Sequence, residues 1–319
     1  MNQTHAVNAK LLKAMTQSQL NVKLSADEYR QRCMLLMPNC CSSIKPLVSS
    51  SQLPLREGKL TVFSQHRHTI NLINQQQQLI TLHRYGSGFA PMGRVLKTAD
   101  FDTVQAALTT DSHLTINQTI NGELKIGHIS IDQASHICHL ELKPDPALSF
   151  DKKGVAQLLQ QINNSTGVHG QLGNLILTPY QAELENLCLQ LSNLLAGNRA
   201  DLTPYIGLGV GLTPSYDDII VGILAVLACD KHFYAPLQRL QDAMQSMPLD
   251  KLTTTISATF LQYALKRQFS LLVMQVVRAL AQGKYHHVSI HKLLNYGHTS
   301  GADLLLGIWL GIDRFIIRD

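Results

Sequence analysis

The pattern of apolar and polar positions changes once along the chain, close to residue 145. Before that point, short runs rich in β-branched residues alternate between apolar and polar positions, which is the period of half-buried strands. Seven runs show this pattern, at residues 61–63, 69–73, 79–83, 113–116, 124–126, 128–131 and 137–142. Because these runs follow one another at short spacing, we expect an antiparallel β domain, built as a barrel or a sandwich.

After residue 145, apolar residues recur at the period of an α-helix. Predicted helices cover residues near 155–162 and 184–195, and then residues 217–229, 235–244, 256–267, 271–281, 288–296 and 302–315. Pro144 and Pro146 mark the boundary, because two prolines in so short a segment interrupt regular structure. We therefore predict an α+β protein. Residues 1–145 form a short helical preface, up to about residue 45, and the β domain; residues 146–319 form an α-helical bundle of about eight helices.

The composition is that of a folded, lightly charged protein. Of the 319 residues, 45% are hydrophobic and 15% are charged, and the chain is long enough for two domains. The net charge of +5 comes from scattered lysines and arginines without a basic run. We therefore expect a small anionic substrate and no nucleic acid partner.

Cysteine usage and the amino terminus bear on location and cofactors. The six cysteines have no framework spacing, which favours reduced thiols and a cytoplasmic protein. The first residues lack a charged region followed by an apolar core, and no apolar run reaches the ~18 residues of a membrane span, so we expect no membrane partner. We predict no cofactor and no metal, since His136, Cys138 and His139 do not supply the four ligands that zinc needs.

Two segments of the helical half share an unusual pattern of glycine, threonine and aspartate. They cover residues 207–222, the first motif, and residues 297–307, the second motif. In each, Gly-x-Thr leads to an aspartate, Asp218 or Asp303, and four residues later comes a glycine, Gly222 or Gly307. Each aspartate would thus lie at a helix N-terminus, above a glycine in the next turn. Because glycine costs about 1 kcal/mol in a helix relative to alanine, the matched pair predicts two helices in close contact and both aspartates at one site.

The two loops have the features of a binding site for a small anion. Free backbone N–H groups and the positive ends of two helix dipoles would point at the ligand. His298 is the candidate acid or base within the motifs. We predict catalytic roles for His298, Asp218 and Asp303, and substrate binding by Gly207, Gly209, Gly211, Thr213, Ser215, Asp217, Thr299, Ser300 and Gly301.

Three other interpretations of these loops rest on the same residues. Ordinary helix capping would explain Thr213, Ser215 and the first-turn acids, taken one motif at a time. A Walker loop is excluded because no lysine lies between Gly207 and Gly222. The dinucleotide fingerprint is also broken, since Leu212 stands where its third glycine belongs.

The two motifs resemble those of the AllH family, described as a subunit of oxamate carbamoyltransferase. The resemblance rests on residues 207–218 and 297–303, and on Thr254, Ser257 and the turn at 268–270 between them. It extends into the β half at residues 63–64, 69–72, 79–82 and 86–91, and covers residues 58–315 in all. The chain has Val210 where a proline is usual in the family and Tyr216 where we expect a glycine, which implies a stiffer loop or a narrower pocket.

The resemblance implies transfer of a carbamoyl group between oxamate and phosphate, in the use of allantoin nitrogen, by one subunit of a hetero-oligomer. It implies that Asp218 or Asp303 accepts the carbamoyl N–H groups and that His298 moves the proton. The N–H groups of residues 209–215 would hold the oxyanion. Hydroxyl groups would orient the phosphate or carboxylate, from Thr213, Ser215 and Thr299.

Two other functions stay open on the residues alone. The chain could be a non-catalytic subunit that binds a small anion or acts as a scaffold, while partner chains supply the chemistry. It could also be a metal-dependent hydrolase built on the carboxylates of Asp217, Asp218 and Asp303.

Overall fold

The computed structural model describes residues 42–111 and 114–316. The predicted helical preface lies outside these residues, except for its last few positions. Those positions form strand β1 (Ser42–Ile44) in place of a helix.

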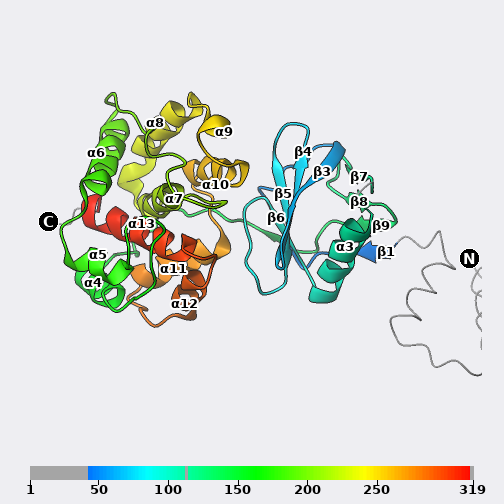
Figure 1. Ribbon diagram of the computed structural model, residues 1–319, viewed down its shortest axis with the longest axis horizontal. Helices are drawn as coiled ribbons and strands as arrows, with labels where there is room; N and C mark the ends of the chain where they lie inside the picture. Colours follow the sequence, from blue (N-terminus) through cyan, green and yellow to red (C-terminus); the bar gives the residue numbers. More distant parts are fainter. Residues whose placement is uncertain (1–41, 112–113, 317–319) are drawn as a thin grey trace, which may run out of the picture. The chain divides into compact units, whose positions relative to one another are not determined.

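Within the described residues, ten strands form one sheet (Figure 1). Their order across the sheet is β1-β9-β8-β7-β3-β4-β5-β6-β2-β10. Each of the seven predicted runs contains or overlaps one of the strands, which confirms the alternating pattern as a strand signal. Beyond β1, the strands are β2 (Val48–Ser50), β3 (Gly58–Gln65), β4 (Thr69–Asn74), β5 (Leu79–Arg84), β6 (Gly93–Leu96), β7 (Ile116–Gln118), β8 (Leu124–Ile126), β9 (Ile129–Ile131) and β10 (Ile137–Cys138).

The sheet is mixed, which differs from the predicted antiparallel barrel or sandwich. β5 pairs with β6 in parallel, and so does β10 with β2. The described strands follow one another in a single open order, with β1 and β10 at its ends. The alternating pattern missed β2 and β6 because polar side chains are buried there: Ser49 is 4% exposed and Arg94 is 2% exposed.

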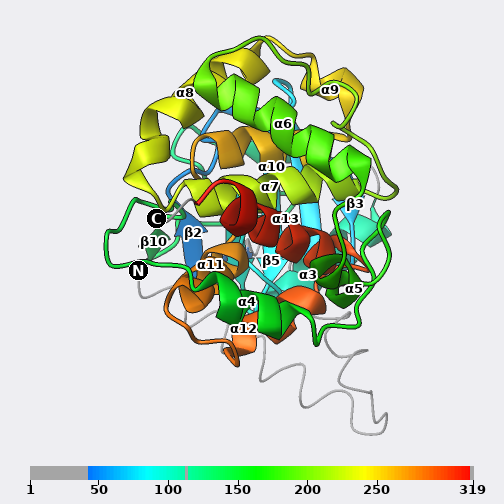
Figure 2. The same cartoon turned by 90° about the vertical axis from the view of Figure 1, so that its left-hand side faces the viewer.

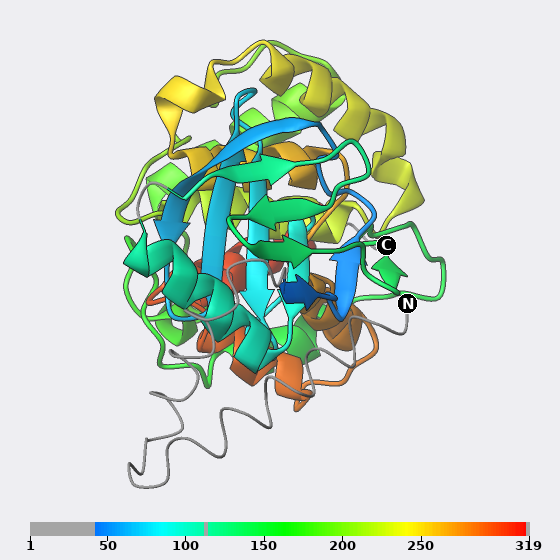
Figure 3. The same ribbon diagram turned by 90° about the vertical axis from the view of Figure 1, so that its right-hand side faces the viewer.

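The central strands are buried on both faces. Leu72 of β4 belongs to the same hydrophobic cluster as Phe101 of helix α3 (Thr98–Thr110), whereas its neighbour Ile73 packs in a cluster with Ile256 from the helical half. Figure 3 shows α3 lying across the strands. The sequence pattern did not predict α3, because only three of its residues are buried, Phe101, Val104 and Leu108.

The helical half is organised around two long buried helices. Figure 2 shows α7 and α13 at its centre, with α6, α8 and α10 on one side and α4, α11 and α12 on the other. All eight predicted helices are present, but the other helices surround the central pair, so the prediction of a bundle is not confirmed. The helices are α4 (Lys152–Leu159), α5 (Leu172–Leu177), α6 (Ala182–Ala196), α7 (Ser215–Leu227), the 3-10 helix η1 (Lys231–Phe233), α8 (Tyr234–Gln245), α9 (Leu249–Leu252), α10 (Thr255–Leu265), α11 (Leu271–Ala281), α12 (Val288–Leu294) and α13 (Ser300–Arg314).

Backbone hydrogen bonds join the two halves of the chain. The Phe269 N–H donates to the Leu140 carbonyl at 3.1 Å, and the Leu271 N–H donates to the Phe89 carbonyl at 2.9 Å. Phe89 and Val95 also belong to the main hydrophobic cluster of the helical half. The two halves of the chain thus contact each other. The division into two domains at residue 145 stays a prediction.

Within the described ranges, no single helix is both long and apolar enough to cross a membrane; α7 and the η1–α8 segment pass that test of length and composition only as a pair bent by 116°.

Candidate functional site

Helices α7 and α13 touch at the two glycines that the motifs share. A Cβ atom built on Gly222 would lie 2.4 Å from the Leu304 carbonyl oxygen, and one built on Gly307 would lie 2.1 Å from the Ile219 carbonyl oxygen. Real Cβ atoms do not approach backbone so closely, so both positions need glycine. The predicted close contact of the two helices is therefore confirmed, and it brings their N-terminal turns to one place.

The loop that leads into α7 depends on its alternating glycines. Gly207, Gly209 and Gly211 have φ angles of +79°, +124° and +96°, which L-residues rarely adopt. A Cβ on Gly207 would lie 2.0 Å from the Leu252 carbonyl oxygen, and one on Gly209 would lie 2.5 Å from the Ser215 nitrogen. These two glycines are packed against backbone, whereas Gly211 faces open space.

Asp217 holds this loop in place. Its Oδ1 accepts a hydrogen bond from the Gly207 N–H at 2.8 Å. Its Oδ2 accepts from the hydroxyls of Ser257, at 2.6 Å, and Thr253. The side chain is 1% exposed, so its carboxylate is buried with its oxygens already partnered. The predicted substrate-binding residue Asp217 thus has a bracing role in the structure.

Asp218 lies beside Asp217 in the first turn of α7, but its surroundings differ. Burial raises the pKa of the Asp218 carboxyl well above its ordinary value, and the carboxylates of Asp303 and Asp217 raise it further; the hydroxyls of Ser300 and Thr213 oppose this shift. Oδ2 of Asp218 is buried and has no hydrogen-bond partner among the described residues. A buried carboxyl oxygen without a protein partner, on a group with a raised pKa, is a feature that marks candidates for functional sites.

Asp303 occupies the matching position in α13 and is 0% exposed. The Gly167 N–H donates to its Oδ1 at 3.0 Å and to its Oδ2 at 3.3 Å. Burial raises the pKa of Asp303, while the Gly167 N–H, the Ser215 and Thr299 hydroxyls and His169 act in the opposite direction. The charge of Asp303 in turn raises the pKa of Asp218, so the two carboxyls lie within electrostatic reach.

The hydroxyl groups of each motif interact with the aspartate of the other motif. Ser300, from the second motif, acts on Asp218, and Ser215, from the first motif, acts on Asp303. The Thr213 and Ser300 hydroxyls are also hydrogen-bonded to each other at 2.8 Å. Four predicted residues, Thr213, Ser215, Thr299 and Ser300, therefore link the aspartates into one cluster.

His298 and Gly301 of the second motif lie in different surroundings. Gly301 packs against α12, since a Cβ there would lie 1.8 Å from the Leu293 carbonyl oxygen. His298 is exposed to solvent, after Gly297 with its φ angle of +67°. Nearby Tyr296 is 40% exposed as a residue, but burial of its hydroxyl and the charge of Asp218 raise the pKa of Tyr296 to about 12. The tyrosine hydroxyl thus lies within electrostatic reach of Asp218.

A third loop, residues 163–171, completes the cluster and was not predicted. A Cβ on Gly167 would lie 2.0 Å from the Ser215 hydroxyl and 3.3 Å from Oδ2 of Asp303, so this loop enters between the motifs. His169 of the same loop is 7% exposed, and its ring lies 5.3 Å from the ring of Tyr216. The sequence signal was the pair Gly167 and Gly170 around this histidine, too short to stand out in a loop between helices.

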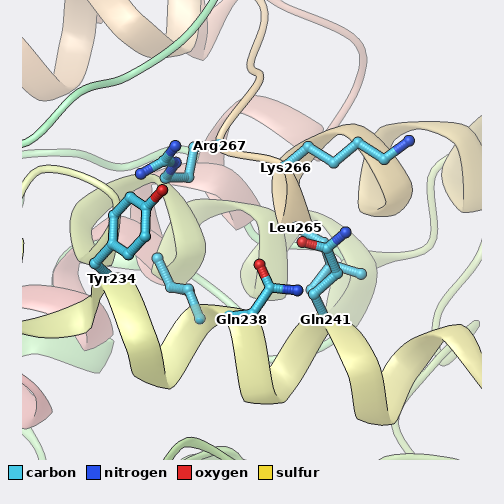
Figure 4. A pocket seen from close by; sticks show the side chains of 7 residues that line it. Tyr234, Gln238, Gln241, Leu265, Lys266 and Arg267 are labelled. Carbon is cyan, nitrogen blue, oxygen red and sulfur yellow. The ribbon is translucent and has the colours of Figure 1, made fainter.

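Other features of the described residues bear on metals and cavities. No group of three or more His, Cys, Asp or Glu side chains in residues 42–111 and 114–316 is arranged to hold a metal ion. A concavity of about 210 Å³ lies between α8 and the end of α10, and there the Arg267 guanidinium lies 4.5 Å from the centre of the Tyr234 ring. Figure 4 shows the side chains that line it. It belongs to neither motif; its lining residues are Tyr234, Leu237, Gln238, Gln241, Leu265, Lys266 and Arg267.

Comparisons with known proteins agree with the resemblance of the two motifs. A family model described as "Oxamate carbamoyltransferase subunit AllH" matches residues 205–312, which contain Asp218, Asp303 and both glycines of the α7–α13 contact. A second model, "AllH family N-terminal domain", matches residues 39–137. No solved structure matches the chain. The chain therefore belongs to the AllH family, whose name is that of a subunit of oxamate carbamoyltransferase.

Proposed function

We propose that the site between the N-terminal turns of α7 and α13 binds a small anionic carbamoyl compound, such as oxalurate, together with phosphate, and releases carbamoyl phosphate and oxamate. The family match supports a role as a carbamoyltransferase subunit within a complex. The observation that carries the proposal of this substrate is the pair of buried carboxyls of Asp218 and Asp303, both with raised pKa values, and Oδ2 of Asp218, which has no hydrogen-bond partner among the described residues. Strongly perturbed carboxyls at the meeting point of two helix N-termini are typical of functional sites.

The raised pKa values resolve a difficulty with an anionic substrate. Ionised Asp217, Asp218 and Asp303 together would repel an anion, in spite of the two helix dipoles. A neutral Asp218 removes one charge and can donate a hydrogen bond as well as accept one. The site can then hold a carboxylate or phosphate by the N–H groups of the loops and a carbamoyl NH₂ group by the aspartate oxygens.

The reaction requires a proton to move when the carbamoyl group changes acceptor. His298 is exposed at the start of α13 and is our candidate for that transfer. The negative charge that develops on the carbamoyl oxygen would be stabilised by the N–H groups of residues 209–215. Thr213, Ser215 and Thr299 would orient the second substrate through their hydroxyls.

The test is phosphate-dependent cleavage of oxalurate by the full chain, alone and together with its partner subunits. We expect Asp218→Asn and Asp303→Asn to lower kcat/KM by at least about 100-fold, and His298→Ala by roughly 10-fold to 1,000-fold, as for other electrostatic and acid–base groups. Asp100→Asn, in the first turn of α3, is the matched control and should leave activity unchanged. If activity appears with partners and survives all three site substitutions, the chain is a binding or scaffold subunit and our catalytic assignment is wrong.

A further inference from the structure

His169 presents a buried nitrogen that no group in the described chain satisfies. Its Nδ1 lies 2.7 Å from Oε1 of Gln181, while its Nε2 is buried and has no hydrogen-bond partner among the described residues. The side chain is 7% exposed, so solvent does not replace the missing partner to any large extent. A buried polar atom left in this state calls for an explanation, and an absent ligand is one.

The loop of His169 is fixed tightly against the aspartate cluster. The Thr166 hydroxyl accepts from the His169 N–H at 3.0 Å and donates to the Gly170 carbonyl at 2.8 Å. Two residues before the histidine, the Gly167 N–H donates to Asp303. The His169 ring lies 5.3 Å from the ring of Tyr216, which precedes Asp217 in α7. The loop is thus packed against Asp303 on one side, and the His169 ring lies beside the first turn of α7 on the other.

The contact with Gln181 sets what Nε2 can do. An amide oxygen only accepts hydrogen bonds, so Nδ1 carries the proton that bonds to Oε1. In the neutral imidazole, Nε2 then holds a lone pair and is an acceptor. It can take a hydrogen bond from an N–H group and repels a carboxylate oxygen.

We propose that Nε2 of His169 accepts an N–H of the amide NH₂ group of oxamate and so selects an NH₂ group over a negatively charged oxygen at the same position. This inference rests on the proposed function, since oxamate is a product of that reaction and would bind at the same site. The amide NH₂ group of oxamate has two N–H bonds; an aspartate oxygen accepts one and His169 accepts the other. Neither family match covers residue 169, because one ends at residue 137 and the other begins at residue 205.

Oxamate and oxalate make the selectivity measurable, because they differ at one end only, NH₂ against O⁻. Binding of each to the full chain in its complex is measured by calorimetry for the wild type and for H169N and H169Q. The asparagine amide keeps a donor near Nδ1 and so retains the bond to Gln181, but it removes Nε2. The glutamine places an amide oxygen near Nε2 and loses that bond.

We expect H169N to bind oxamate at least about 10-fold more weakly, the value of one hydrogen bond, with oxalate binding unchanged or tighter. H169Q should recover part of the preference for oxamate and unfold at a lower temperature. If His169 has a purely structural role, H169N should keep the wild-type preference for oxamate over oxalate, and H169Q should lose both stability and that preference. In the wild type, ¹⁵N NMR should show a shift of Nε2 when oxamate is added, and this test does not depend on the folding of any variant.

The outcomes separate this inference from the proposed function. If D218N and D303N abolish oxamate binding while H169N keeps wild-type selectivity and the Nε2 signal does not move, the role of His169 is disproved and the proposed function stands. If D218N and D303N also bind oxamate normally, the site itself is wrongly placed and both proposals fail.

Discussion

Three aspartates that look alike in the sequence have different surroundings in the structure. Asp217 accepts hydrogen bonds on both oxygens, whereas its neighbour Asp218 has a buried oxygen without a partner in the described part of the chain. The sequence could not distinguish them, because the partners of Asp217 come from Thr253 and Ser257, far along the chain. A position on a helix predicts which face a side chain lies on, but not the loop that later covers it.

The bracing role of Asp217 gives the first prediction. Asp217→Ala leaves the Gly207 N–H and the Ser257 hydroxyl without their buried acceptor, so we expect the free energy of unfolding to fall by about 3 kcal/mol. Urea unfolding at neutral pH measures this. Asp250→Ala, in the first turn of the exposed helix α9, is the control and should change stability by less than about 0.5 kcal/mol. An equally small effect at Asp217 would show that its hydrogen bonds contribute nothing net.

The raised pKa of Asp218 predicts that replacing this aspartate increases stability at higher pH, whereas replacing Asp217 decreases it. Its folded pKa lies well above the unfolded value near 3.8, so folding favours the protonated carboxyl. The contribution of the protonated Asp218 carboxyl to the free energy of unfolding is complete below pH 3.8. It is lost as the pH rises through the folded pKa, because the ionised carboxyl is unfavourable in the buried site. Asp218→Asn, which cannot ionise, should therefore become more stable relative to the wild type as the pH rises from 4 to 8.

Urea unfolding of both proteins at each pH checks this. Asp303→Asn should show the same trend, since burial raises the pKa of Asp303 too. A stability difference between wild type and Asp218→Asn that stays constant, or falls, with rising pH would contradict the assignment of a neutral carboxyl. If either asparagine variant is more stable but less active than the wild type, the carboxyl at that position lowers the free energy of unfolding and is needed for activity.

At the level of elements, the contact between α7 and α13 is the feature that the sequence predicted best. Two glycines four residues after two aspartates were enough, because helical periodicity fixes their place relative to the helix start. The sheet was predicted less completely. β4 and β5 followed from their β-branched runs, but β6 contains buried Arg94, whose guanidinium donates to the Gly122 and Asp132 carbonyls, and a buried charge hides a strand from any apolar pattern.

The helix contact gives the third prediction. Gly222→Ala would place a Cβ 2.4 Å from backbone, which cannot move aside without separating the helices, and Gly307→Ala meets backbone in the same way. We expect each to lower the free energy of unfolding by at least about 2 kcal/mol, although alanine is the better helix former by about 1 kcal/mol. Because the helices carry Asp218 and Asp303, oxamate affinity should fall as well.

Gly311→Ala is the matched control on the same helix. Its Cβ would lie 2.9 Å from the Cβ of Val226 and 3.3 Å from the Ile223 carbonyl oxygen, so its closest backbone contact is longer than the 2.4 Å and 2.1 Å contacts of Gly222 and Gly307. We expect a change of less than about 1 kcal/mol, since the gain in helix propensity offsets the crowding. Thermal unfolding of the three variants ranks them. If Gly311→Ala is as harmful as Gly222→Ala, the close approach is not special to the glycines that follow the aspartates.

Across the whole molecule, the site depends on segments that the sequence places far apart. The loop of Gly167 and His169 reaches Asp303 across 136 residues of sequence, and a sequence pattern carries no information on such a contact. The two halves of the chain are linked similarly. Ile256 of α10 packs with Ile73 and Leu79 of the sheet, and Phe89 enters the core of the helical half.

These shared cores predict that the two halves unfold together. Trp309, the one tryptophan, is 5% exposed in α13 and reports on the helical half, while Phe101 is 0% exposed in the cluster of α3 and the sheet. Phe101→Ala should lower the free energy of unfolding by about 3–5 kcal/mol and shift the Trp309 fluorescence transition in urea by as much as the circular dichroism transition. Exposed Phe63 supplies the control, and Phe63→Ala should move neither transition appreciably. If Phe101→Ala leaves the Trp309 transition in place, the halves fold independently and the site needs the helical half alone.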